Sequence, residues 1–343
     1  MTNTSGAAPE QHNRASKSIG MWGATGSGKT TFLAALNFAV LRSDNEDLRL
    51  YGVDDASTRF LTQGNYDLTT RHSFPDATQQ IRGLSWVMSL SSEAPVRRMF
   101  GRMARASAPA EFNLDLCDPP GRVFGSAPAP APRPQRRMDI DSAPPDIPPA
   151  AVPDRDIVEY LARCQGALLL IDPIRERALG DAQDSFQATL LRIAQHYLPG
   201  QQPGSRLPHY VAVCITKFDD PEVYALARAN GYCSHDEGDK HWFPRVHDAH
   251  AERFFRELGD KLDIGDIDLV CSGLSRFFYP GRVRYFVTSA IGFHVGPDGR
   301  FHPEDYQNVV EEPGKQVRVR GKIRPINVLE PVLWLGQQIT AAG

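Results

Sequence analysis

The residues with the clearest chemistry lie near the amino end of the chain, where residues 23–31 have the sequence G-A-T-G-S-G-K-T-T. This run fits the pattern G-x-x-x-x-G-K-[ST], in which glycines let the backbone curl and point successive N–H groups at a phosphate. In this chemistry the ammonium of Lys29 reaches the β- and γ-phosphates, and the hydroxyl of Thr30 ligates Mg²⁺. The candidate phosphate-binding residues are Gly23, Ala24, Thr25, Gly26, Ser27, Gly28, Lys29, Thr30 and Thr31.

The elements that must position this loop flank it directly. Residues 19–22 form a short apolar run that predicts a strand, and the pattern of residues 31–42 predicts a helix. A helix that begins at the loop directs its N-terminal N–H groups and the positive end of its dipole at the anion. The alternative is a Gly-rich turn with a chance lysine, and the order strand, loop, helix favours nucleotide binding over it.

Composition excludes several classes of protein. The chain has 343 residues and a formal net charge of −3, so it can bury a substantial core and is not a polycation that binds nucleic acid by net charge. Its five cysteines show no disulfide spacing, which indicates a reducing compartment. No run approaches the ~20 apolar residues of a membrane helix, and residues 1–17 lack a signal-peptide core. We therefore expect a cytoplasmic protein.

A second polar cluster follows a predicted strand. Residues 84–90 and 112–117 predict an antiparallel strand pair, and the second of them leads into Asp118-Pro119-Pro120-Gly121. An aspartate at the carboxyl end of a strand can approach Mg²⁺, and the following glycine amide can reach a γ-phosphate. D-P-P-G is also a common turn, but its place after a phosphate loop and a strand favours the functional interpretation.

The rest of the chain alternates strands with helices. This alternation predicts an α/β fold with a mostly parallel sheet, flanking helices and a ligand at the carboxyl ends of the strands. Residues 43–80 are polar and irregular, and proline at 173 is expected to end a strand. The predicted strands are 167–172, 210–215 and 284–290, and the predicted helices are 154–163, 181–197, 222–229, 247–262 and 326–339.

We expect one domain over residues 19–343 after a disordered segment at 1–18, with three inserts. The insert at 91–110 contains a basic segment, residues 96–105, with apolar residues at helical spacing and arginines around them. This segment is either a docking helix for a protein partner, nucleic acid or a membrane surface, or an ordinary packed helix. The insert at 122–153 is rich in proline and predicts a flexible loop, and residues 292–325 form a loop-rich tail before the last helix.

Four motifs now stand in one order: GATGSGKT, DPPG, TKFD and TSA. This order resembles the Ras-like P-loop GTPases of the translation-factor-related class, in outline over residues 19–340. The resemblance implies a P-loop NTPase fold with GTP or GDP and Mg²⁺ as ligands. The long inserts and the tail also look like bacterial GTPases of multi-protein operons, including those called double-GTPase proteins. This resemblance implies a protein partner or activator, such as another GTPase subunit.

The resemblance also assigns roles to individual residues. It makes Asp118 and Gly121 the Mg²⁺ and γ-phosphate sensor, and Thr78 the best-placed switch I threonine, with Thr69 and Thr70 as the other candidates. It therefore implies a catalytic set and a set of metal ligands. The catalytic set is Lys29, Thr78, Asp118 and Gly121, and the metal ligands are Thr30, Thr78 and Asp118.

The base would be recognised by two further motifs of the resemblance. Thr216, Lys217 and Asp219 look like the guanine motif, with Thr where Asn is more usual. Ser289 and Ala290 resemble the loop whose backbone amide meets guanine O6. The sequence departs from the family after Gly121, where Arg122 stands in place of the usual Gln, and this departure predicts slow hydrolysis or help from a partner.

Several alternatives stay open at this stage. The leading hypothesis is a GTP-dependent molecular switch, and the others are a P-loop ATPase or nucleotide kinase and a GTP-binding scaffold with negligible turnover. A zinc site at Cys233, His235 and His241 is a further alternative, but no fourth ligand is spaced as a structural site requires.

Overall fold

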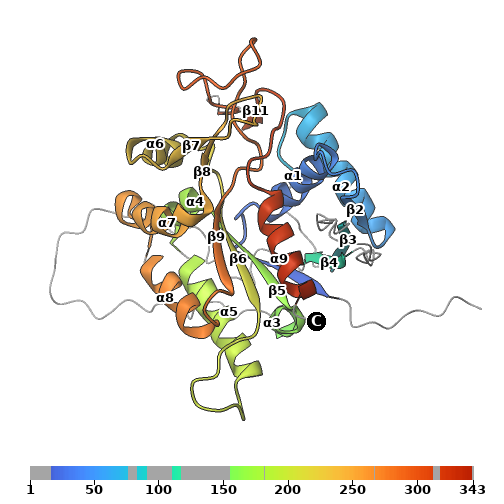
Figure 1. Ribbon diagram of the computed structural model, residues 1–343, viewed down its shortest axis with the longest axis vertical. Coiled ribbons are helices and arrows are strands. Elements are labelled where there is room, and N and C mark those ends of the chain that lie inside the picture. The colour runs from blue at the N-terminus through green and yellow to red at the C-terminus, as the bar shows by residue number, and fades with distance from the viewer. Residues whose placement is uncertain are drawn as a thin grey trace, which may run out of the picture.

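The computed structural model describes residues 17–75, 83–90, 110–116, 155–180, 182–265, 267–311 and 317–341. The centre of this part of the chain is a seven-stranded sheet with the order β2-β3-β4-β1-β5-β6-β9 (Figure 1). Its strands are β1 Ser18–Trp22, β2 Arg49–Gly52, β3 Leu84–Leu90, β4 Ala110–Leu116, β5 Gly166–Ile171, β6 Tyr210–Ile215 and β9 Val283–Val287.

The sheet is mostly parallel. Neighbours in the run β4-β1-β5-β6-β9 pair in parallel, whereas β3 pairs antiparallel with β4 from Leu84 opposite Leu116 to Leu90 opposite Ala110. The expected α/β fold and the expected antiparallel pair are thus confirmed, and β2 extends the pair by a further antiparallel partner of β3. Because the strands of the run are parallel, the loops that follow β1, β5, β6 and β9 meet at one edge of the sheet.

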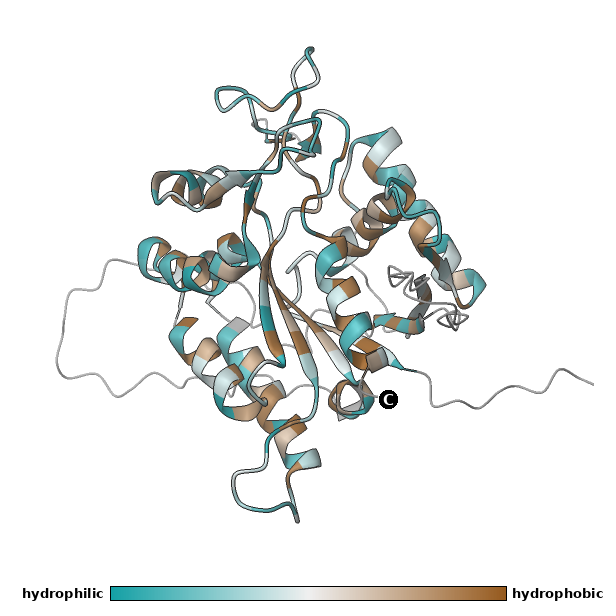
Figure 2. Cartoon of the chain, in the orientation of Figure 1, coloured by the Kyte–Doolittle hydropathy of each residue, from teal (hydrophilic) through white to brown (hydrophobic). Residues whose placement is uncertain are grey.

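Helices cover both faces of the sheet. Met21 packs with α1 (Lys29–Leu41) and α9 (Leu329–Ala341) on one face, and its neighbour Trp22 packs with a second group of helices on the opposite face. Such alternation is what the two-residue repeat of a strand requires. Figure 2 shows the hydrophobic residues concentrated on the strands and on the inner sides of the helices. The helices of the second face are α3 Arg155–Arg163, α5 Ala182–Tyr197, α6 Pro221–Ala229, α7 Asp248–Leu262 and α8 Ile267–Phe277.

The prediction of irregular structure over residues 43–80 was wrong in its described part. Besides β2, the segment forms helix α2 (Asp55–Tyr66) and a π-helical turn at Asp67–Arg71. The Asp54 carboxylate begins α2 by accepting a hydrogen bond of 2.7 Å from the backbone N–H of Ser57. The helix is hard to detect in the sequence because the residues it buries are Ser57, Leu61 and Gly64, which give almost no apolar stripe.

A second difference lies after β5, where proline at 173 was expected only to end the strand. Pro173 instead begins helix α4 (Pro173–Leu179), because a proline tolerates the first turn of a helix, where its missing N–H has no partner to lose. Helix α8 was not expected either. The remaining predicted strands and helices occur within about one to three residues of their expected ends.

Two short hairpins complete the described structure. Strands β7 (Cys233–His235) and β8 (Pro244–Val246) pair with each other, and so do β10 (Val309–Val310) and β11 (Arg318–Val319) in the segment 292–325. Figure 1 shows β7, β8 and β11 at one end of the molecule and α3, α5 and α8 at the other. No helix in the described ranges is long and apolar enough to cross a membrane. Residues 1–16, the basic segment 96–105 and the proline-rich residues 122–153 lie outside the described residues.

Candidate functional site

The glycine-rich loop lies between β1 and α1, as its sequence predicts, and its backbone requires glycine at Gly28 and Gly23 for different reasons. Gly28 precedes α1 with φ 92°, in the left-handed region that side chains with a Cβ rarely adopt. At Gly23 the reason is close packing, since a Cβ there would lie 2.6 Å from the carbonyl oxygen of Leu170 on β5. The loop is therefore pressed against the carboxyl end of the neighbouring strand.

Several polar side-chain atoms of this loop are buried. Lys29 is only 4% exposed, and its Nζ donates to the carbonyl oxygens of Gly23 at 3.0 Å and Ala24 at 3.1 Å. The hydroxyl oxygens of Thr25 and Ser27 are buried and have no hydrogen-bond partner within the described part of the chain. Buried polar groups are normally paired, so the two hydroxyls are candidates to bind a ligand.

A cleft of about 800 Å³ begins at this loop and extends along the carboxyl edge of the sheet. Its volume falls in the range of ligand-binding pockets, roughly 300–1,000 Å³. Residues far apart in sequence line it together. They include Gly26, Ser27, Gly28 and Thr31 of the loop, Thr216, Lys217 and Asp219 after β6, and Thr288 and Ala290 after β9.

Asp219 is the most perturbed acid of this cleft. Burial raises the pKa of its carboxyl from 3.8 to about 6, with smaller opposing effects from the Ser289 hydroxyl and Lys217. The side chain keeps some exposure to the cleft, so the surrounding protein desolvates the carboxylate without closing it off.

The orientation of Asp219 is fixed by the loop after β9. The Ser289 hydroxyl donates to Asp219 Oδ1 at 2.5 Å, and it accepts a hydrogen bond of 2.7 Å from the backbone N–H of Gly292. Ser289 is fully buried, and its single hydroxyl proton is committed to the carboxylate. One oxygen of Asp219 is thus held by the protein.

Lys217 and Thr216 tie the end of β6 to the end of β5. Lys217 has φ 57°, an uncommon left-handed conformation for a residue with a Cβ, and its Nζ lies 2.8 Å from Asp172 Oδ2. Asp172 is buried and also caps α4, where Oδ1 accepts from the backbone N–H groups of Ile174 and Arg175 at 3.0 Å each. The Thr216 hydroxyl donates to the Ile171 carbonyl at 3.1 Å, so it links the residue after β6 to the last residue of β5.

The structure brings the loop, the TKFD motif and the TSA motif to one cleft. Of the three proposed metal ligands it describes only Thr30, in the first turn of α1, because Thr78 and Asp118 lie outside the described residues. The catalytic candidate Gly121 lies outside them too. The other switch I candidates lie in the π-helical turn, where the Thr69 hydroxyl donates to the Asn65 carbonyl at 2.6 Å.

The three residues of the alternative zinc site do not converge. His235 Nδ1 lies 2.9 Å from the Trp242 carbonyl oxygen, and His241 Nδ1 lies 2.7 Å from that of Gly299. Across the described ranges, no group of three His, Cys, Asp or Glu side chains is placed to hold a metal ion.

Sequence reasoning missed some residues of the site. Asp172 gave one signal, an acid at the end of an apolar strand, whereas Phe74 and the residues of the segment 292–325 that line the cleft gave none. Phe74 and Val319, for example, pack in one cluster although they are more than 200 residues apart in the sequence, so no local pattern reports their contact.

No family model and no curated protein sequence matches this chain. Solved structures with a similar arrangement include the signal recognition particle receptor SRb-GTP/SRX complex of Chaetomium thermophilum, at 13% identity and a TM-score of 0.34, over 82% of this chain and 93% of that one. Two others are Sup35 complexed with GDP (11%, TM-score 0.29, 83% of this chain and 40% of that one) and the S. cerevisiae Ski7 GTPase-like domain bound to GTP (10%, 0.33, 94% and 50%). Similarity of this size concerns the outline of the fold, so the function must be argued from this chain's own site.

Proposed function

We propose that this protein is a GTP-binding molecular switch with slow GTP hydrolysis, related to the P-loop GTPases of the translation-factor class. One observation carries the proposal: a desolvated carboxylate, Asp219, is held by Ser289 in the same cleft whose other end is the glycine-rich loop. The loop would take the phosphates of the nucleotide, and the carboxylate would select its base.

The chemistry of Asp219 distinguishes guanine from adenine. A carboxylate accepts hydrogen bonds from the N1–H and the exocyclic amine of guanine, whereas adenine presents an acceptor at N1 and no 2-amino group. The Ala290 backbone N–H, next along the chain from Ser289, would donate to guanine O6, a position where adenine carries a donor amine. A buried carboxylate left without these donors would cost about 1–3 kcal/mol or more, which favours GTP over ATP by roughly 100-fold.

The phosphates and Mg²⁺ would be held by the loop and the start of α1. The ammonium of Lys29, which now contacts the Gly23 and Ala24 carbonyls, would turn to the β- and γ-phosphates. Thr30, together with Thr78 and Asp118 outside the described residues, would hold Mg²⁺, which neutralises the charge of the phosphates. The loop N–H groups at the amino end of α1 would complete the anion site.

The switch would lie in Thr78 and in residues 118–153, which follow the γ-phosphate sensor. GTP would hold these segments in one arrangement, and hydrolysis would release them to a protein partner in the cytoplasm, such as another GTPase subunit. Arg122 in place of Gln leaves no amide side chain after Gly121 to orient the attacking water, so turnover would be slow or would need that partner.

The test is the identity of the bound nucleotide. The protein is purified without added nucleotide and denatured, and the released nucleotide is identified by ion-exchange chromatography, with the Lys29→Ala variant as the control. We expect GDP or GTP in the wild type and neither in the variant. Release of ATP or ADP, or preference for ATP over GTP in a competition titration, would refute the guanine assignment and leave a P-loop ATPase.

A further inference from the structure

The cleft has a second wall that none of the sequence motifs accounts for. It is made by the β10–β11 hairpin and its flanks in the segment 292–325, which approach the cleft from beyond the TSA motif. The residues of this wall are Gln307, Val309, Val310, Glu311 and Val317. Three of them are valines, so the wall offers apolar surface to whatever occupies the cleft.

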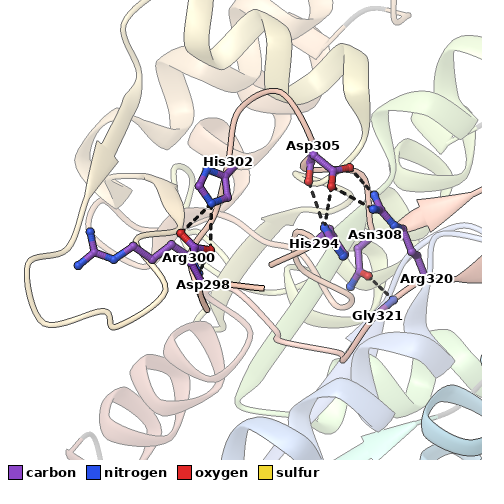
Figure 3. A network of polar contacts seen from close by, with 8 residues as sticks. All are labelled: His294, Asp298, Arg300, His302, Asp305, Asn308, Arg320 and Gly321. Atoms are coloured by element: carbon purple, nitrogen blue, oxygen red, sulfur yellow. Dashed lines mark hydrogen bonds and ion pairs between the residues drawn. The ribbon is translucent and has the colours of Figure 1, made fainter. Parts of the chain in front are cut away.

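One buried side chain fastens the two arms of this hairpin together. Asn308 is 1% exposed; its Nδ2 donates to the Lys322 carbonyl at 3.2 Å, and its Oδ1 accepts from the Gly321 N–H at 2.8 Å. The Arg320 N–H donates to the Asn308 carbonyl at 2.7 Å, so the residue contacts the opposite arm through both its side chain and its backbone. Figure 3 shows Asn308 beside Gly321 and Arg320.

Exposed ion pairs of the same segment contribute less. Asp305 pairs with Arg320 at 3.0 Å next to the hydrogen bonds of Asn308. Asp298 pairs with His302 at 2.9 Å in an outer loop (Figure 3). Such pairs are solvated and stabilise little. The Asp298–His302 pair also involves no residue that lines the cleft, which makes it a suitable control.

The hairpin is joined to both sides of the site. Toward the base-recognition loop, the Arg324 N–H donates to the Ile291 carbonyl at 2.9 Å, directly after Ala290. Toward the segment that precedes Thr78, the Val319 N–H donates to the His72 carbonyl at 2.9 Å. Phe74 then packs with Val319 in a small apolar cluster and lines the cleft itself.

We propose that the β10–β11 hairpin is part of the nucleotide site and retains the bound nucleotide by covering its base and ribose. The inference rests on the proposed function, since it takes the occupant of the cleft to be a guanosine di- or triphosphate. A wall that contacts the nucleotide after binding slows dissociation more than association, because the contacts must break before release. Asn308 acts as a positioning residue that keeps this wall in place.

The experiment measures dissociation of fluorescent N-methylanthraniloyl-GDP, chased with excess GDP, from the full-length wild type and three variants. Asn308→Ala removes two hydrogen bonds of a buried side chain and should speed release by up to about thirtyfold, which corresponds to about 2 kcal/mol. Val310→Ser keeps the hydrogen bonds of Asn308 but makes the wall more polar, and should speed release about threefold. Asp298→Ala, the matched control in the same segment, should release at the wild-type rate.

Two readouts separate retention from general damage. The association rate constant and the preference for GDP over ADP should stay unchanged in Asn308→Ala and Val310→Ser, and thermal unfolding identifies a variant that fails to fold. If Asn308→Ala does not fold, Val310→Ser decides alone. Wild-type release from every folded wall variant would overturn the inference while leaving the proposed function intact. If the wild type binds ADP instead of GDP, the proposed function fails, and the same chase with labelled ADP decides whether the hairpin retains a nucleotide. If the wild type binds neither GDP nor ADP, both the proposed function and this inference are overturned.

Discussion

The substitution Asp219→Asn should change the base that this protein prefers. The Ser289 hydroxyl accepts from the Gly292 N–H, so it must donate its proton to residue 219. An asparagine would therefore turn its amide oxygen to Ser289 and its NH₂ to the base. Guanine would then present donors to a donor, whereas xanthine presents an acceptor at its 2-oxo group.

The magnitude follows from the bonds that are lost. Hydrogen bonds to a charged group contribute about 1.5–3 kcal/mol each, so loss of the carboxylate should weaken GTP by roughly 100-fold or more. Xanthosine triphosphate should gain affinity over the wild type. In the free protein the effect on stability has the opposite sign: a pKa of about 6 in place of 3.8 means that ionised Asp219 costs up to about 3 kcal/mol at neutral pH. The variant without nucleotide should therefore melt at a higher temperature.

The pH dependence of binding gives an independent check. Because the folded pKa is raised, protonated Asp219 stabilises the free protein below about pH 4, and this contribution is lost as the pH rises through about 6. GTP needs the ionised carboxylate, so its affinity should fall by up to about tenfold per pH unit below pH 6. Asp219→Asn should lack this decline, and the ratio of wild-type to variant affinity cancels the titration of the phosphates.

The assay is displacement of a fluorescent guanine nucleotide by GTP, ATP and xanthosine triphosphate between pH 5 and pH 8. Lowered GTP affinity, raised xanthosine triphosphate affinity and a raised melting temperature in the variant would support the reasoning together. Unchanged GTP affinity in Asp219→Asn, or equal displacement by GTP and ATP from the wild type, would show that this carboxylate does not contact the base.

Four further predictions concern the phosphate loop, Ser289 and the rate of hydrolysis. Lys29→Ala should abolish nucleotide binding, because the phosphates lose a buried counter-charge. Thr30→Ala should raise the Mg²⁺ concentration needed for binding more than it lowers the affinity for the nucleotide. Wild-type values for either variant in calorimetry would contradict the corresponding prediction. Ser289→Ala should weaken GTP about tenfold, because Asp219 loses the donor that orients it, and a titration with unchanged affinity would refute that role. Because Arg122 replaces the usual Gln, phosphate release by the isolated protein should stay well below about 1 s⁻¹, and faster turnover without a partner would contradict this.

The outline of the fold could be predicted where apolar residues form a continuous run or recur at helical spacing. The buried strands β5 and β6 are continuous apolar runs, and α7 carries a clear apolar stripe, so the alternation of strands and helices was visible. Helix α2 buries one large apolar side chain, Leu61, beside Ser57 and Gly64, and α4 begins at a proline, so neither follows the usual pattern. The basic segment 96–105, Thr78, Asp118 and Gly121 stay predictions, because they lie outside the described residues.

The sequence by itself determined the local parts of the site. A glycine-rich loop, the strand before it and the helix after it follow from spacing along one short stretch, because backbone turns and helix starts depend on neighbouring residues. Only the tertiary structure decided which distant groups complete these parts. It placed Asp172 against Lys217 and Ser289 against Asp219, and it set the Asn308 hairpin along the cleft. Such contacts depend on which strands lie side by side in the parallel sheet and on where the inserted segments lie against it. The spacing of residues along the sequence does not encode either arrangement.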